Sequence, residues 1–339
     1  MKKVIIRDQY WDSLKFILIN FIVLEHTIAL NAPNGSFNCT LHNLIPTFAL
    51  PLFVFVSGRF SHIKDREKYK KGILKIVETY LFFQFIWQLI HLACGKDLNW
   101  NFFIRFFISP SWTLWYLVSI VWWRILILLL SEEVLKERPF MILASSFLIS
   151  ILGGLIPFNA CFSLQRTMAY IPFFFMGYYS TNLDVRAYVK NVPIFMPFIV
   201  FAVMFLFFYF CLNFNLSYVM QCKVSYWSMP EMSIVQKILS RCSLLFLATL
   251  MSLMVMRIVP RNQIIAKYGT ITLFFYMYHT FLVKLFQFGE KYGFIPKSEW
   301  ILIIYAFLIM IILILLSRCK FFNLILNPVS NYIYRKGFK

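Results

Sequence analysis

Apolar residues along this chain are gathered into long blocks that short polar segments separate. A helix needs about 20 predominantly apolar residues to cross the hydrocarbon core of a bilayer, and blocks of that length recur here. The pattern therefore predicts an all-α, polytopic membrane protein with about ten transmembrane helices. The predicted spans are residues 12–30, 43–60, 72–92, 111–130, 139–157, 165–180, 193–213, 238–256, 264–286 and 299–317.

The segments between these spans are too short for a soluble domain, so we expect a single membrane domain over residues 1–339. An even number of spans leaves both termini on one side of the membrane. With a cytoplasmic N-terminus, most of the 33 Lys and Arg residues fall in cytoplasmic segments, as the positive-inside rule expects. The sequence therefore predicts that both termini are cytoplasmic.

Composition excludes two other classes of protein. Hydrophobic residues make up 60% of the chain and charged residues only 14%, whereas soluble domains carry about 25% charged residues. The net charge of +19 could suggest nucleic acid, but loop Lys and Arg account for it, so we expect no nucleic-acid partner. The seven cysteines are irregularly spaced and predict neither a metal site nor a disulfide framework.

The first span carries polar side chains for which a passive span has no use. Lys15 and His26 are eleven residues apart, so on a helix they share one stripe and lie about 16 Å apart along the axis. Asp12 falls about 40° from that stripe. Such groups are costly in lipid and so indicate a functional site. The alternative is a packing histidine together with a Lys–Asp pair at the membrane surface.

Four cations are candidates for binding an anionic ligand. Arg59 follows the run Pro51–Gly58 of the second span, and Lys71 lies in the basic segment after it. These residues could hold the phosphates of a nucleotide-bearing donor, or they could serve only topology and anionic lipid. Arg124 and Arg166 lie at span depth, where an arginine needs a carboxylate, a carbonyl or a ligand phosphate.

The remaining titratable groups leave their roles open. Glu25 precedes His26 but points about 100° away from it on a helix, so it is not automatically its partner. His279 lies in an apolar run, where a packing role is at least as reasonable as a functional one. His42 and His62 are expected in loops.

Several catalytic signatures are missing from the chain. The sequence has no H-E-x-x-H, no G-x-S-x-G, no Walker-type loop and no Gly-rich dinucleotide turn. Zinc chemistry, serine-hydrolase chemistry, ATP hydrolysis and nicotinamide cofactors are therefore not expected.

Five dispersed motifs nevertheless resemble the acyltransferase 3 family of integral-membrane O-acyltransferases, and within it the fucose 4-O-acetylase-like branch. In chain order they are Arg7, Asp12, Leu14, Lys15 and His26; the run Pro51–Gly58; Trp115-Tyr116-Leu117 with Trp123-Arg124; Arg166 with Pro172-Phe173-Phe174, Gly177 and Tyr178; and Tyr268, Gly269, Leu273, Tyr276 and His279. The chain departs from the family pattern at Phe16, Glu25 and Ala49-Leu50, where the family often has a small residue, a glycine and a histidine.

The resemblance implies transfer of an acyl group, usually acetyl from acetyl-CoA on the cytoplasmic side, to a hydroxyl of a glycan or lipid-linked glycan. No tightly bound cofactor or metal is implied, and the setting would be the bacterial inner membrane, with its lipids as further partners. The implied catalytic set is His26 as base or acyl relay, with Lys15 and Asp12. The implied donor set is Arg59, Lys71, Arg124 and Arg166. The implied acceptor set is Glu25, Trp115, Tyr116, Tyr276 and His279.

Two other functions stay open at the level of the sequence. In a proton-coupled transporter or flippase of a glycan or small solute, His26, Glu25 and His279 would form a proton relay. A non-catalytic scaffold for glycan assembly would need none of these groups.

Overall fold

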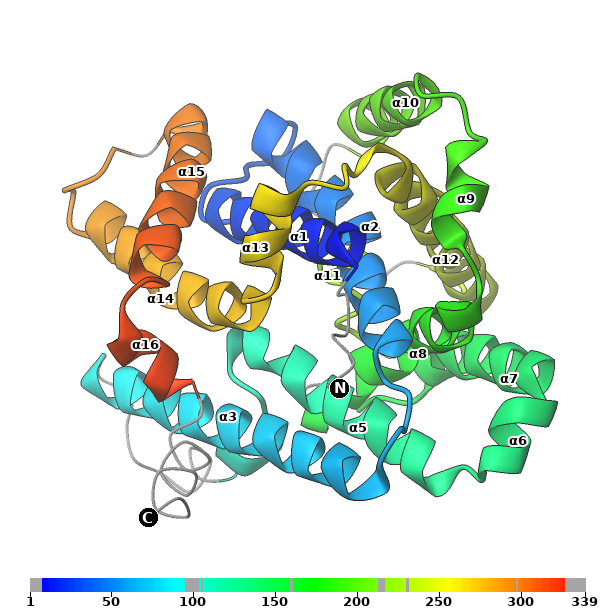
Figure 1. The fold of residues 1–339 in the computed structure, drawn as a ribbon. Helices are drawn as coiled ribbons and strands as arrows, with labels where there is room; N and C mark the ends of the chain where they lie inside the picture. The colour runs from blue at the N-terminus through cyan, green and yellow to red at the C-terminus, as the bar shows by residue number, and fades with distance from the viewer. Residues whose placement is uncertain are drawn as a thin grey trace, which may run out of the picture. The chain divides into compact units, whose positions relative to one another are not determined.

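The computed structural model describes residues 8–94, 104, 106–158, 161–212, 217–229, 232–296 and 298–326. Across these ranges the chain is helical and has no β-strand, as Figure 1 shows. The predicted all-α class is therefore confirmed for the described part of the chain. Arg7 of the first motif lies outside the described residues.

Five helical segments of the described chain are long and apolar enough to cross a membrane. They are α2 (Phe37–Arg59), α3 (Arg66–Ala93), η1 with α5 (Trp112–Leu129), α12 (Ile234–Ile258) and α15 (Glu299–Leu316). Shorter apolar helices are α7 (Pro139–Leu152), continued by η2 (Gly153–Leu155), and α10 (Met196–Phe210). These lengths support an integral membrane protein, while the count of ten spans stays a prediction.

The chain divides into two compact units that alternate along the sequence. The first contains Met1–Val56, Asp184–Met220 and Leu245–Arg318, and the second contains Ser57–Leu183, Gln221–Leu244 and Cys319–Lys339. Two helices, α2 and α12, continue from one unit into the other. Each unit is built from three segments that alternate along the chain. This division does not test the prediction of a single domain.

The first unit is built around α1 (Gln9–Ile28). The Asp8 side chain accepts a hydrogen bond from the Tyr10 amide and begins the helix, as N-cap carboxylates do. Leu14, Leu18 and Val23 are fully buried on α1. The helix packs against α13 (Gln263–Gly269), α14 (Thr272–Lys291) and α15, and Figure 1 shows α13 beside α1. The remaining helices of this unit are α9 (Val185–Lys190), α10 and α11 (Ser217–Met220).

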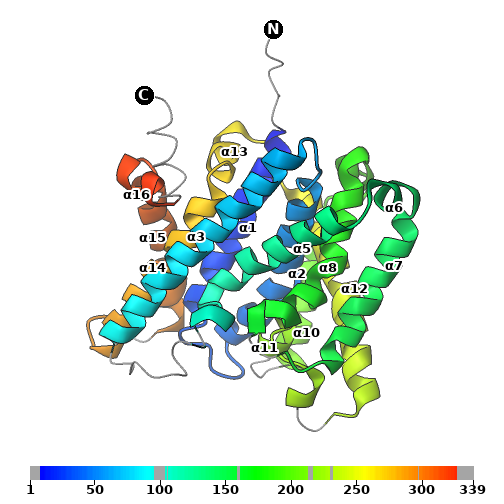
Figure 2. The same cartoon turned by 90° about the horizontal axis from the view of Figure 1, so that it is seen from below.

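The second unit packs α5 (Trp115–Leu129) against α8 (Leu164–Tyr179), and α8 against α7, an arrangement visible in Figure 2. Trp123 stacks on Phe174 with ring centres 5.2 Å apart, and its Nε1 donates to the Thr167 carbonyl at 3.0 Å. Earlier on α5, Trp115 stacks on Tyr170 of α8. The two stacked pairs follow the same order along both helices, so α5 and α8 run in the same direction. The unit also holds α6 (Glu132–Glu137), α16 (Lys320–Ile325), η3 (Cys161–Ser163), η4 (Ser180–Asn182) and η5 (Tyr226–Ser228).

Two expectations from the sequence are wrong in detail. His42 lies within α2 rather than in a loop, because the Ser36 hydroxyl caps the Cys39 amide at 3.0 Å and α2 begins at Phe37. The predicted span 264–286 is not continuous, because α13 ends at Gly269 and α14 begins at Thr272. A Cβ atom on Gly269 would lie 1.7 Å from the Asp12 carbonyl oxygen, so this glycine permits the close approach of α13 to α1.

Candidate functional site

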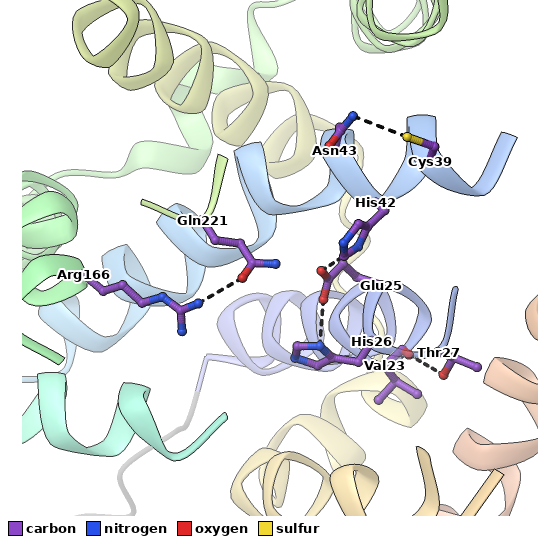
Figure 3. A network of polar contacts seen from close by, with 9 residues as sticks. All are labelled: Val23, Glu25, His26, Thr27, Cys39, His42, Asn43, Arg166 and Gln221. Carbon is purple, nitrogen blue, oxygen red and sulfur yellow. Dashed lines mark hydrogen bonds and ion pairs between the residues drawn. The ribbon is translucent and has the colours of Figure 1, made fainter. Parts of the chain in front are cut away.

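The Glu25 carboxylate lies between two imidazoles in the first unit. Its Oε2 is 2.9 Å from Nδ1 of His26, and its Oε1 is 3.0 Å from Nδ1 of His42. Figure 3 shows the carboxylate pointing at both rings, one from its own helix α1 and one from α2. Glu25 is only 4% exposed, and a buried carboxylate of this kind is retained only when it is paired.

His279 on α14 contacts the other side of this cluster. Its ring stacks on that of His26 with centres 5.4 Å apart and planes within 18°. The His279 Nδ1 lies 3.0 Å from the Phe275 carbonyl oxygen one turn earlier, and the residue is completely buried. Tyr276 is the next aromatic neighbour, at 6.1 Å between ring centres. Three of the predicted polar residues, with Tyr276, therefore form one cluster in the first unit.

This cluster has the geometry of an oriented base. Since Nδ1–H of His26 points at a carboxylate, the second ring nitrogen, Nε2, is left with the lone pair that accepts a proton. A carboxylate in this position also stabilises the imidazolium that forms when the base is protonated. His42 was missed as a participant because its place in a helix was not predicted.

Asp12 and Lys15 form a second polar pair on the same helix. The Lys15 Nζ lies 2.6 Å from Asp12 Oδ1, and the Asp12 side chain is nearly buried. Eleven residues separate Lys15 from His26, about 16 Å along α1. The structure therefore brings Asp12 and Lys15 together, and separates that pair from the imidazole cluster by about three helical turns.

Arg124 and Lys71 lie near one another in the second unit. The Arg124 guanidinium carbon is 5.7 Å from the ring centre of Tyr69 on α3. A Cβ atom on Gly72 would lie 3.7 Å from Arg124 Nη1, so the guanidinium reaches α3 beside Lys71. The Arg124 Nε is buried and has no hydrogen-bond acceptor among the residues that the structure describes. This place can hold an anion.

Tyr116 lies on the same helix, α5, as Arg124. Its hydroxyl lies 2.7 Å from the Ser57 hydroxyl of α2, and it interacts electrostatically with Arg124.

Arg59 uses its donors on the backbone at the end of α8. Its Nη1 donates to the Ser180 carbonyl and, at 3.1 Å, to the Ser180 hydroxyl. The neighbouring His62 lies in a loop, as expected, with Nε2 2.8 Å from the Tyr178 carbonyl and its ring stacked on Tyr178 at 3.9 Å. Arg59 therefore satisfies carbonyl groups at a helix end, which need such partners.

Arg166 lies far from Arg124 within the second unit. Its guanidinium stacks over Trp115 at 4.4 Å, and its Nη2 donates to Gln221 Oε1 at 3.0 Å, the contact drawn in Figure 3. Trp115 precedes Arg124 by nine residues on α5, about 14 Å along the helix. The two arginines therefore cannot hold one and the same phosphate group.

The predicted sets thus divide between the two units. The catalytic set (Asp12, Lys15 and His26) belongs to the first unit, and the four donor-binding cations belong to the second. The acceptor set is divided, with Glu25, Tyr276 and His279 in the first unit and Trp115 and Tyr116 in the second. Among the described residues, no group of three or more His, Cys, Asp or Glu side chains could hold a metal ion.

Arg241 on α12 was not among the residues predicted from the sequence. In the structure this arginine is buried, with 3% of its surface exposed. The rule that singled out Arg124 and Arg166, an arginine at span depth, would have found it.

Comparisons with known proteins identify the family. No curated protein and no solved structure was found to match the chain. The family model described as an acyltransferase domain matches residues 8–318, which include every residue of the predicted site. The chain therefore belongs to the acyltransferase 3 family and is a membrane acyltransferase.

Proposed function

We propose that this protein is an O-acetyltransferase of the fucose 4-O-acetylase-like branch, which moves acetyl from acetyl-CoA to a hydroxyl of a cell-surface glycan or its lipid-linked precursor. The observation that carries the proposal is the contact between Glu25 and the Nδ1 of His26. A transporter would need a polar path, whereas this pair has the arrangement of a base and the group that orients it.

In the proposed reaction, Nε2 of His26 accepts the proton of the acceptor hydroxyl. The hydroxyl oxygen then attacks the thioester carbonyl carbon, and the carbon–sulfur bond breaks. The coenzyme A thiolate leaves and takes up the proton that the His26 imidazolium carries, so that the base is restored. Glu25 stays ionised and holds the imidazole ring in place, with His42 as its second partner.

The donor phosphates are assigned to Arg124 and Lys71. Guanidinium and ammonium groups bind phosphate oxygens strongly when water is partly excluded. In the ten-span topology with both termini cytoplasmic, these residues lie near the cytoplasmic face, where acetyl-CoA is made available, and the protein lies in the bacterial inner membrane. Arg59 would support this region by fixing the ends of α2 and α8 rather than by touching the donor.

The acceptor is assigned to aromatic side chains in addition to His26. Sugar rings stack their C–H faces on flat aromatic rings, and Trp115, Tyr116 and Tyr276 offer such rings. His279 would complete the packing of His26 and keep its ring plane fixed.

The test is acetyl transfer by purified protein, together with the acetyl content of the surface glycan. His26→Ala should abolish both while leaving the protein in the membrane at the normal level. Lys15→Ala should strongly weaken use of the donor. An active His26→Ala protein would remove its role as base. Uptake of a solute driven by a pH gradient, with no consumption of acetyl-CoA, would replace the enzyme by the transporter.

A further inference from the structure

Arg241 is a buried cation without a carboxylate partner in the described part of the chain. It lies on α12 and is 3% exposed, and its polar neighbour is the Tyr226 side chain, with which neither Nη1 nor Nη2 reaches full hydrogen-bond geometry. No carboxylate of the described residues lies within ion-pair distance of it either. A guanidinium in such surroundings is costly unless an anion pairs with it. The side chain is therefore prepared for a negatively charged group.

A tyrosine holds the guanidinium in place. The Arg241 guanidinium carbon is 5.8 Å from the ring centre of Tyr226, an arrangement of a cation over an aromatic ring. The Tyr226 hydroxyl donates to the Ile151 carbonyl at 2.8 Å, and a Cβ atom on Gly154 would lie 2.3 Å from the ring. The tyrosine is thus seated tightly on the end of α7, and it presents a fixed surface to Arg241.

Arg166 interacts with the same tyrosine, Tyr170, as Arg241 does. Both Arg166 and Arg241 interact electrostatically with the hydroxyl of Tyr170, which is buried. Arg166 also lies over Trp115, whose ring stacks on Tyr170 with centres 5.9 Å apart. Two guanidinium groups therefore act on one buried tyrosine hydroxyl, and the ring of Trp115 lies against that tyrosine.

The segment after Gln221 adds a third cation. Lys223 lies near Arg166, and partial burial together with the Arg166 charge lowers the pKa of its ammonium group. No carboxylate among the described residues pairs with Lys223. Arg166 thus has a second cation, Lys223, near it in addition to sharing Tyr170 with Arg241, and the repulsion between these positive groups would be relieved by a bound anion.

We propose that Arg241, Arg166 and Lys223 bind an oxyanion on the acceptor, a carboxylate of an acidic sugar or a phosphate, while Trp115, Tyr170 and Tyr226 pack against the sugar rings. This inference rests on the proposed function, because it names the class of acceptor that the transferase uses. The acceptor is accordingly an anionic glycan rather than a neutral one.

The cluster is separate from the assigned donor site. Arg166 stacks on Trp115, and Arg124 lies about 14 Å further along α5. In the proposed topology, Arg166 near the start of α8 and Arg241 in the first third of α12 both fall in the non-cytoplasmic half, away from Arg124. The two sets of cations would then serve the two substrates of one transfer.

The test uses the purified full-length protein in neutral detergent and three acceptors. They are an oligosaccharide with uronic acid residues, the same oligosaccharide after reduction of its carboxyl groups to alcohols, and a neutral oligosaccharide with a terminal phosphate. The wild-type KM should be roughly ten- to hundredfold lower for an anionic acceptor than for the reduced one. The favoured member, carboxylate or phosphate, identifies the source of the oxyanion. Equal KM values for all three would overturn the proposal without any variant being made.

Arg241→Gln should remove this preference while the KM for acetyl-CoA stays unchanged. The matched control is Arg261→Gln, which removes one positive charge from a half-exposed side chain and should keep the preference. An Arg241→Gln protein that still prefers the anionic acceptor also overturns the proposal.

A binding measurement separates this proposal from the proposed function. Glucuronate or inorganic phosphate alone should raise the unfolding temperature of the wild-type protein and of Arg261→Gln, but not of Arg241→Gln. If no acceptor is acetylated and this shift is still seen, the proposed function fails and the anion site stands. If acetyl is transferred but no shift and no charge preference are seen, the anion site fails alone.

Discussion

The Oε2 atom of Glu25 lies 2.9 Å from Nδ1 of His26, although the two residues are adjacent on one helix. Adjacent helical side chains point about 100° apart, so this contact requires both side chains to turn toward each other. The second oxygen of Glu25, Oε1, lies 3.0 Å from Nδ1 of His42 on α2. This second contact stabilises the orientation of the carboxylate.

Glu25→Gln should separate orientation from charge, because the amide keeps the shape of the side chain but cannot stabilise an imidazolium. We expect kcat to fall by about a hundredfold or more, with little change in the KM for acetyl-CoA. Steady-state transfer measured with purified protein checks this. The matched control is Glu133→Gln, an exposed carboxylate on α6, which should leave kcat unchanged. Equal kcat values for Glu25→Gln and the wild type would contradict the assigned role.

His42→Leu should cost stability more than activity. The substitution removes one of the contacts of the buried Glu25 carboxylate, and this loss should lower the free energy of unfolding by about 1–3 kcal/mol. The Glu25–His26 contact remains. We therefore expect a lower unfolding temperature and a loss of kcat smaller than that of Glu25→Gln. His42→Gln retains a donor and should recover part of the stability. A larger loss of kcat for His42→Leu than for Glu25→Gln would make His42 the main partner of the carboxylate.

The length of an apolar segment can be read from a sequence, whereas the rotation of one helix relative to another cannot. Each predicted span overlaps a helix of the structure, since a block of some 20 apolar residues has few alternatives in a membrane. The contact between Glu25 and His42 depends on how α1 and α2 face each other, and on a start of α2 at Phe37 that the capping Ser36 sets. Arg241 needs no such knowledge of packing, because an arginine at span depth is visible in the sequence and the reasoning applied to Arg124 and Arg166 covers it as well.

Gly269→Ala should weaken the packing of α13 on α1. The added methyl group would meet the Asp12 carbonyl oxygen, and overpacking of this kind costs about 1–3 kcal/mol. Gly72→Ala is the matched control, because its nearest atom would lie at an ordinary contact distance of 3.7 Å and alanine favours the helix by up to about 1 kcal/mol. Thermal unfolding in detergent should therefore shift in opposite directions for the two variants. A shift in the same direction would mean that α13 can move away from α1 freely.

Arg124→Gln should impair recognition of the donor nucleotide without touching the acceptor. Wild-type protein is expected to use acetyl-CoA better than acetyl-pantetheine, which carries the same thioester but none of the phosphates that a guanidinium would bind. Removing the Arg124 charge should raise the KM for acetyl-CoA roughly tenfold and leave that for acetyl-pantetheine unchanged, so the difference between the two donors narrows. Arg138→Gln, an exposed residue between α6 and α7, should keep the wild-type difference. If Arg124→Gln discriminates between the donors as well as the wild type does, the unsatisfied Nε of Arg124 serves some other anion, and the donor phosphates must be sought at Lys71 and its basic neighbours.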